Sequence, residues 1–216
     1  MTEQNFEAMR RTMVATQLRT TGVDDPRVLA AMSAVARERF VPAERRAMAY
    51  ADAIVPLAGG RGLNPPMTLG LMLREARLRG DERVLVVGAA TGYAAAVLAR
   101  LAATVVAIEE SSDLVSFARE VLGDLPVELI EAPLAAGHRA GAPFDFILVD
   151  GAIETLPAEL VDQLCERGRI VLARVDSGVS RLCLGQRIAG SVAPACFADA
   201  SAVRLPGFSP PASFSF

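Results

Sequence analysis

The feature that most constrains the fold is a strand, a glycine turn and a helix in direct succession near the middle of the chain. The apolar run at 84–87 is rich in valine, Gly88 and Gly92 bracket a short turn, and an alanine-rich stretch follows. A second β-branched run at 104–108 completes a strand-helix-strand pattern. With Arg100 as its only charge, the segment is long enough to span a bilayer. The glycines and the two β-branched runs argue against a membrane span and predict a β-α-β unit instead.

The same alternation continues toward the C-terminus. It predicts further strands, with helices between them, at 105–109, 127–130, 144–149 and 169–173. Alternation of this kind implies a parallel sheet with right-handed crossovers and helices on both faces, and such sheets bind ligands at the carboxyl ends of their strands. The runs at 182–188 and 193–205, separated by Gly190, predict an antiparallel hairpin that closes the sheet.

The N-terminal part of the chain is predicted to be helical. Apolar residues at spacings of three and four mark a first helix from Phe6, which the Thr20-Thr21-Gly22 sequence ends. A second helix is expected after Asp25, with Pro26 in its first turn. The stretch 56–66 is rich in glycine and proline and is predicted to be a long surface loop, with Arg61 exposed to solvent.

Length and composition favour one globular domain. The chain has 216 residues, of which 52% are hydrophobic, and this is enough for a full core. We therefore expect a single domain over 1–216, with an N-terminal helical and substrate-loop segment at 1–80, a cofactor-binding core at 81–175 and C-terminal strands at 176–216. The net charge of -3 and pI near 5.3 give no reason to expect nucleic acid as a partner.

The cysteines, the single histidine and the N-terminus exclude several classes. Cys165, Cys183 and Cys196 are odd in number and lack metal-ligand spacing, so we expect buried thiols in a reducing compartment. His138 alone cannot form a multi-histidine metal site. Because residues 1–5 do not resemble a secretory signal, the expected location is the cytoplasm.

The glycine turn and the acid that follows it predict a nucleoside cofactor. Gly88 and Gly92 would let a ligand approach the backbone beside a helix N-terminus. Glu109 ends the next strand, where an acid commonly accepts hydrogen bonds from ribose hydroxyls; a tight turn and a solvated glutamate are the alternative. Ala90 stands where a dinucleotide loop needs its second glycine, which disfavours NAD. S-adenosylmethionine, which has an amino-acid end instead of a pyrophosphate, places a smaller demand on this loop.

Nearly the whole chain resembles the protein-L-isoaspartate O-methyltransferase family, class I methyltransferases that repair isoaspartyl sites. The matches include an N-terminal lead-in that ordinary methyltransferases lack, and they comprise Met13-Val14, Gln17-Leu18, Gly22-Val23, Val28-Leu29, Ala31-Met32, Arg37-Glu38, Phe40-Val41-Pro42, Ala49-Tyr50, Asp52, Gly92-Tyr93, Ala95 to Ala99, Ala142 to Asp145, Leu156-Pro157, Gln163-Leu164, Gly168-Arg169, Val203-Arg204 and Pro206. The resemblance implies a Rossmann-like, doubly wound α/β fold with a mostly parallel sheet, N-terminal helices and a C-terminal antiparallel hairpin.

The departures from the family pattern fall at functional positions. Val86 replaces a glutamate, Ala90 replaces the middle glycine, and Pro133 replaces the aspartate that contacts adenine. The family's loop with its threonine and serine corresponds to 60–66, which has no hydroxyl. These changes predict weakened cofactor binding. Glu131, Asp150 and Glu110 follow or end predicted strands and are candidates to compensate.

The resemblance implies a definite reaction and a definite site. The reaction is transfer of a methyl group from S-adenosylmethionine to an isoaspartyl carboxylate of a protein or peptide, with no membrane partner. The alternatives are a catalytically silent member that acts as a binding or regulatory module, and a methyltransferase with a changed acceptor. Because an acceptor carboxyl with a pKa of ~4 is already ionised at neutral pH, orientation is the main task, and the Asn64 amide is a suitable donor. The implied site has Asn64 as the catalytic residue, Arg61, Gly62, Leu63 and Pro66 at the substrate, and Gly88, Ala90, Gly92, Tyr93, Glu109 and Pro133 at the cofactor.

Overall fold

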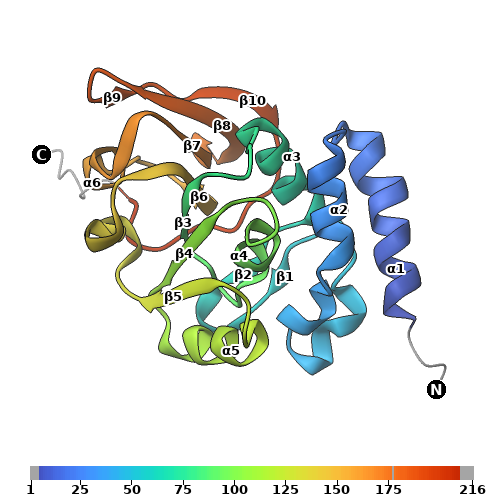
Figure 1. Cartoon of the computed structure of the whole chain (residues 1–216). Coiled ribbons are helices and arrows are strands. Elements are labelled where there is room, and N and C mark those ends of the chain that lie inside the picture. The colour runs from blue at the N-terminus through green and yellow to red at the C-terminus, as the bar shows by residue number, and fades with distance from the viewer. Residues whose placement is uncertain (1–4, 177, 210–216) are drawn as a thin grey trace, which may run out of the picture.

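An eight-stranded, mostly parallel sheet forms the centre of the protein (Figure 1). The computed structural model describes residues 5–176 and 178–209. The order along the main path of the sheet is β10-β8-β7-β6-β3-β4-β5, with β9 paired to β8. The parallel strands are β3 (Arg83–Val87), β4 (Thr104–Glu109), β5 (Val127–Glu131), β6 (Phe144–Ile153) and β7 (Leu164–Asp176). The predicted α/β class and parallel core are confirmed.

The central strands are buried on both faces, which explains their continuous apolar sequence. In β3 the side chains alternate between two clusters, since Val84 and Val86 belong to one and Leu85 and Val87 to the other. The first cluster is covered by α2 (Pro26–Ala34), α3 (Pro66–Ala76), α4 (Tyr93–Leu98) and α5 (Ser112–Leu122). The second is covered by short segments, namely α6 (Ala158–Asp162), the 3-10 turn η6 (Leu134–Ala136) and the C-terminal Leu205 and Phe208.

The N-terminal helices begin and end where the sequence predicts. Helix α1 (Phe6–Thr12) continues through a π-helical turn, η1 (Met13–Leu18), and a 3-10 turn, η2 (Arg19–Thr21), and ends at Gly22 with φ +91°. The Asp25 side chain accepts hydrogen bonds from the first backbone N–H groups of α2. The 3-10 segments η3 (Arg37–Phe40) and η4 (Ala43–Met48) follow. In Figure 1 these blue elements lie together on one side of the sheet.

The C-terminal strands form the predicted antiparallel extension. Strand β8 (Val179–Ile188) pairs with β7, with β9 (Ser191–Val192) and with β10 (Ala195–Asp199). Only 195–199 of the predicted second arm 193–205 pairs with β8. The chain then crosses to β6, where Arg204 forms a parallel bridge with Ala152.

Two cysteines are joined by a disulfide, which corrects the prediction of three free thiols. Cys183 on β8 and Cys196 on β10 lie directly opposite each other, with their Cα atoms 3.8 Å apart. Their pairing depends on the register of the hairpin, which the spacing of the cysteines does not indicate. Cys165 is free and half-buried. None of the helices within 5–176 and 178–209 combines the length and the apolar character that a membrane span requires.

The loop at 56–66 is only partly the surface loop that we predicted. Its first half, with the 3-10 turn η5 (Ala58–Gly60), is mostly exposed, but 61–66 is buried. Strand β1 (Val55–Pro56) pairs with β2 (Gly62–Leu63) and turns the chain inward. A Cβ at Gly62 would lie 2.9 Å from the side chains of both Ile54 and Val203, so the close packing here requires glycine.

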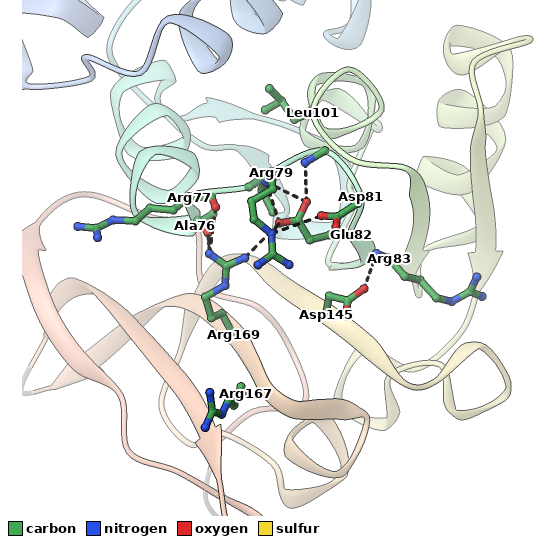
Figure 2. A network of polar contacts seen from close by, with 12 residues as sticks. Ala76, Arg77, Arg79, Asp81, Glu82, Arg83, Leu101, Asp145, Arg167 and Arg169 are labelled. Atoms are coloured by element: carbon green, nitrogen blue, oxygen red, sulfur yellow. Dashed lines mark hydrogen bonds and ion pairs between the residues drawn. The ribbon is translucent and has the colours of Figure 1, made fainter.

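At the amino edge of the sheet, Glu82 anchors the loop that enters β3 (Figure 2). Its carboxylate is 1% exposed and accepts hydrogen bonds from the backbone N–H groups of Arg79 and Gly80. The Arg169 guanidinium of β7 adds a bond of 3.2 Å. This network ties β3 to β7 at the edge opposite the predicted site.

Candidate functional site

The candidate site lies at the carboxyl ends of β3 and β4, where Gly88 follows β3 and Glu109 ends β4. The N–H groups of Gly88 and Ala89 both donate to the carbonyl of Ile108 at 3.0 Å, so the glycine turn is fastened to β4. Gly88 has φ +82°, and Ala90 has φ +50°. Ala90 therefore keeps a left-handed conformation that favours glycine, although its side chain is alanine.

All acceptor capacity of the Glu109 carboxylate is used within the protein. Oε1 accepts from the N–H groups of Glu110 at 3.0 Å and Ser111 at 3.2 Å. Oε2 accepts from the Ala90 N–H at 2.8 Å and from Arg61 Nη2 at 2.8 Å. An ionised carboxylate offers about four lone-pair sites. Glu109 is completely buried, so the alternative of a solvated glutamate is excluded.

Arg61 is the residue for which the sequence interpretation is wrong. It is 6% exposed and pairs with Glu109, whereas we expected it to face solvent. Arg61 is buried because the β1–β2 pairing turns the second half of the loop into the interior of the protein. Its Nη2 atom forms the ion pair, while Nε and Nη1 are buried without a hydrogen-bond partner among the described residues.

Asn64 is buried beside Asp150, which lies in the second half of β6, the strand that pairs with β3. Its Nδ2 donates to Asp150 Oδ1 at 2.8 Å and to the Asp150 carbonyl at 3.0 Å. Its Oδ1 accepts from the Val203 N–H at 2.8 Å. Asn64 thereby joins the loop, strand β6 and the C-terminal segment at one point.

Asp150 sits in a low-dielectric surrounding that disfavours its charged form. Burial raises the pKa of the Asp150 carboxyl, and the nearby Glu109 carboxylate acts in the same direction. The Asn64 hydrogen bond and the cations Arg37 and Arg61 act in the opposite direction, but burial is the larger effect.

Arg37 anchors the backbone of Asn64 from the interior of the protein. It is completely buried, donating from Nε to the Ala49 carbonyl and from Nη2 to the Asn64 carbonyl, both at 2.6 Å. Its guanidinium carbon lies 4.6 Å from the centroid of the Tyr93 ring. Burial lowers the pKa of Arg37 and raises the pKa of the Tyr93 hydroxyl. Tyr93 also stacks edge-on against Phe40.

The C-terminal segment packs directly against the glycine turn. A Cβ at Gly88 would lie 3.0 Å from Leu205 and 3.3 Å from Arg61 Nη2. A Cβ at Gly151 would lie 2.6 Å from Leu205 and 2.7 Å from the Val203 carbonyl. Space next to both glycines is therefore filled by side chains and backbone of this chain.

The other predicted site residues divide into two groups. Leu63 and Pro66 are buried in the inward half of the loop, together with Gly62. A Cβ at Gly92 would meet the Leu122 side chain at 3.1 Å, so this glycine contacts α5 closely. Pro133 is exposed, although Ala132 before it donates to the Glu109 carbonyl at 3.0 Å. Glu110 and Glu131 are exposed, and of the three compensating candidates only Asp150 is buried here.

Three residues of this site were not assigned a role from sequence. Arg37 and Val203 fall within motifs that match the family. The match marks these positions as part of the family pattern, but it does not indicate that both residues contact Asn64. Leu205 has no local signal, because its position depends on the crossing of the C-terminal segment to β6.

In the described conformation, side chains of this chain occupy the space that S-adenosylmethionine would use. Arg61 and three backbone donors occupy the Glu109 oxygens that a ribose would need. Leu205 and Arg61 occupy the approach to Gly88. A bound cofactor would require both side chains to move.

The family model of protein-L-isoaspartate(D-aspartate) O-methyltransferases matches residues 9–192. A relative from Anaeromyxobacter sp., named protein-L-isoaspartate O-methyltransferase 2, is 42% identical over 82% of this chain and 74% of its own. A protein-L-isoaspartate O-methyltransferase from Methylorubrum populi is 45% identical over 77% of this chain and 79% of its own.

Solved structures agree on the fold. A protein-L-isoaspartate O-methyltransferase superposes with a TM-score of 0.80 at 22% identity, covering 92% of this chain and 66% of its own. A Plasmodium falciparum protein described as the same enzyme, in complex with S-adenosyl-L-homocysteine, gives 0.76 at 21% identity over 93% and 98%. The resemblance seen in the sequence is confirmed, and the chain belongs to the protein-L-isoaspartate(D-aspartate) O-methyltransferase family.

Proposed function

We propose that this chain transfers a methyl group from S-adenosylmethionine to the carboxylate of isoaspartyl residues in protein or peptide chains. We place this activity in the cytoplasm. Family membership supports the reaction class. The single structural observation that supports it is the position of loop 61–66, which we call the acceptor loop. It lies beside the end of β4 that a nucleoside cofactor would use, close enough for Arg61 to reach Glu109.

The acceptor needs orientation more than it needs a base. A carboxyl group with a pKa of ~4 is ionised at neutral pH and can act as the nucleophile without proton transfer. Correct placement of the reacting atoms can contribute roughly 7 to 11 kcal/mol. We assign this placement to Asn64. Its Nδ2 bonds to the side chain and the carbonyl of Asp150, so donation to the acceptor carboxylate exchanges one of these two bonds.

Burial raises the pKa of the Asp150 carboxyl, so its ionisation is disfavoured relative to that of a solvated aspartate. Gly62 and Leu63 belong to the buried part of the loop, and Pro66 is the first residue of α3. We assign these residues to the wall of the acceptor site.

A methyl-transfer assay with an isoaspartyl peptide tests the proposal. The wild-type chain is incubated with S-adenosylmethionine labelled in the methyl group, with the aspartyl peptide of identical sequence as the control. We expect label on the isoaspartyl peptide alone, released by mild base as expected for a methyl ester. Cofactor binding without label on the isoaspartyl peptide would show that the acceptor is different.

The role of Asn64 is tested by two variants. Asn64→Ala removes the donor and is expected to lower kcat by roughly 100-fold, since small misplacement of reacting groups has effects of this size. Asn64→Ser returns the hydroxyl of the family loop and is expected to retain more activity than Asn64→Ala. Equal rates for the three proteins would remove Asn64 from the acceptor site.

A further inference from the structure

We propose that Arg61 acts as an internal latch on Glu109, and that its release, together with movement of Leu205, controls access of the cofactor to this site. The inference rests on the proposed function, because it concerns the same cofactor. It assigns to Arg61 a role in cofactor access, in addition to its position in the acceptor loop.

The Glu109 carboxylate is saturated with hydrogen-bond donors. Three of its four donors are backbone N–H groups of the glycine turn and of the start of α5, and these are fixed by the fold. Among the donors to Glu109 within the described residues, only Arg61 donates from a side chain, and a side chain can move away. A ribose hydroxyl can therefore reach this carboxylate only in exchange for Arg61.

The Arg61–Glu109 bond that a ribose hydroxyl must replace is a strong one. The Arg61–Glu109 distance is 2.8 Å, with side-chain exposures of 5% and 0%. Hydrogen bonds between two ionised groups are stronger than those of a neutral hydroxyl. Removal of Arg61 alone would leave a buried carboxylate without its counter-ion. The state in which Arg61 pairs with Glu109, which we call the closed state, is therefore favoured unless the Arg61 guanidinium gains other partners or solvent.

Among the described residues, the Arg61 guanidinium forms its bond through Nη2 alone. Its Nε and Nη1 atoms are buried without a partner within residues 5–176 and 178–209. Buried nitrogens of this kind carry a desolvation cost that exposure to solvent would relieve. This cost lowers the free-energy difference between the closed state and a state in which Arg61 faces outward.

Leu205 closes the other side of the same space. It lies against both Gly88 and Gly151, and its segment is held by two backbone bonds to Ala152, at 2.7 and 2.9 Å. The Val203 N–H adds the bond to Asn64. Arg61 and the C-terminal segment therefore meet above Gly88, and opening requires both to move.

The test is calorimetric titration of wild type and Arg61→Gln with S-adenosyl-L-homocysteine. Glutamine keeps a neutral donor but removes the charge, so we expect the Kd to fall by roughly tenfold or more. Arg204→Gln is the matched control, because Arg204 is exposed beside Leu205 and pairs with Glu154 instead. Its Kd is expected to equal that of wild type.

An Arg61→Gln protein that is folded but binds no more tightly than wild type, within about twofold, overturns the latch. If circular dichroism shows that this variant is unfolded, Leu205→Ala and hydrogen exchange decide. Leu205→Ala should bind S-adenosyl-L-homocysteine more tightly, and millimolar ligand should speed exchange of the Leu205 and Val203 amides in wild type. Unchanged affinity and unchanged exchange would overturn the proposal.

The proposed function can fail separately. If Arg61→Gln binds S-adenosyl-L-homocysteine more tightly but neither protein methylates an isoaspartyl peptide, the latch stands and the acceptor assignment falls. If wild type methylates the peptide and the Kd of Arg61→Gln is unchanged, the function stands and the latch falls.

Discussion

The Arg37 guanidinium carbon lies 4.6 Å from the centroid of the Tyr93 ring, in the interior of the protein. This contact links the N-terminal segment to the helix that follows the glycine turn. The same guanidinium donates to the carbonyls of Ala49 and Asn64. Arg37 therefore fixes the back of the acceptor loop relative to α4, although it contributes no atom to the site surface.

Arg37→Met is expected to destabilise the fold by about 2 to 5 kcal/mol, because two buried carbonyls lose charged donors. Urea denaturation measures this change. Arg39→Met is the matched control, since Arg39 is exposed and its bond to the Val121 carbonyl is 3.5 Å long. The control should change stability by less than about 0.5 kcal/mol. Equal losses in the two variants would contradict the role of Arg37.

Ala90→Gly is expected to stabilise the protein by up to about 1 kcal/mol, because φ +50° strains alanine more than it strains glycine. Thermal denaturation measures the effect as a rise in Tm. Ala89→Gly provides the control one residue earlier, where the alanine is completely buried and φ is not positive. That change should destabilise by about 1 kcal/mol through added chain entropy and a lost methyl contact. The same sign for both variants would exclude strain at Ala90.

The parts of this fold that could be predicted from sequence are those with local causes. The strand at 84–87 and the turn at Gly88 follow from apolar runs and glycine positions within a few residues. The Asp25 cap and the stop at Gly22 are likewise set by neighbouring residues. In each case the residues that determine the element lie within one or two turns of chain.

The contacts that decide the state of the site are long-range. Arg61 and Glu109 are 48 residues apart, and Asn64 and Val203 are 139 apart. No periodicity connects such positions, and a glycine-rich loop around Arg61 favours a surface interpretation. The β1–β2 pair that buries Arg61 has two residues in each strand, which is too short for an alternation pattern. The strand, the glycine turn and the helix of the site could therefore be predicted, but the occupation of the space above Gly88 by Arg61 and Leu205 could not.

Glu82→Gln is expected to destabilise the protein by about 2 kcal/mol, because two backbone donors and Arg169 lose a charged acceptor. Asp81→Asn is the control: it is the exposed neighbour, its ion pair with Arg79 is 75% exposed on both sides, and its effect should be under about 0.5 kcal/mol. Urea denaturation compares the two. Since Glu82 precedes β3 and Gly88 follows it, S-adenosyl-L-homocysteine affinity should be unchanged. A changed affinity in the folded variant would show that the two edges of the sheet are coupled.

Asp150→Asn tests the raised pKa of the Asp150 carboxyl. Because the folded-state pKa exceeds the unfolded value, protonated Asp150 favours the fold. Its contribution is fully present below the unfolded pKa of about 3.9 and is lost as pH rises through the folded pKa. Asparagine cannot ionise and still accepts the Asn64 bond through its own oxygen. The variant should therefore gain stability relative to wild type as pH increases.

The measurement is the difference in unfolding free energy between Asp150→Asn and wild type, from urea denaturation at several pH values between 4 and 8. The other ionisable groups near this carboxyl, Arg37, Arg61 and Glu109, are common to both proteins and cancel in the difference. We expect the difference to move steadily in favour of the variant with rising pH. A difference that does not change with pH would mean that the Asn64 hydrogen bond and the cations offset the burial of Asp150, and a difference that moves in favour of wild type would mean that they outweigh it.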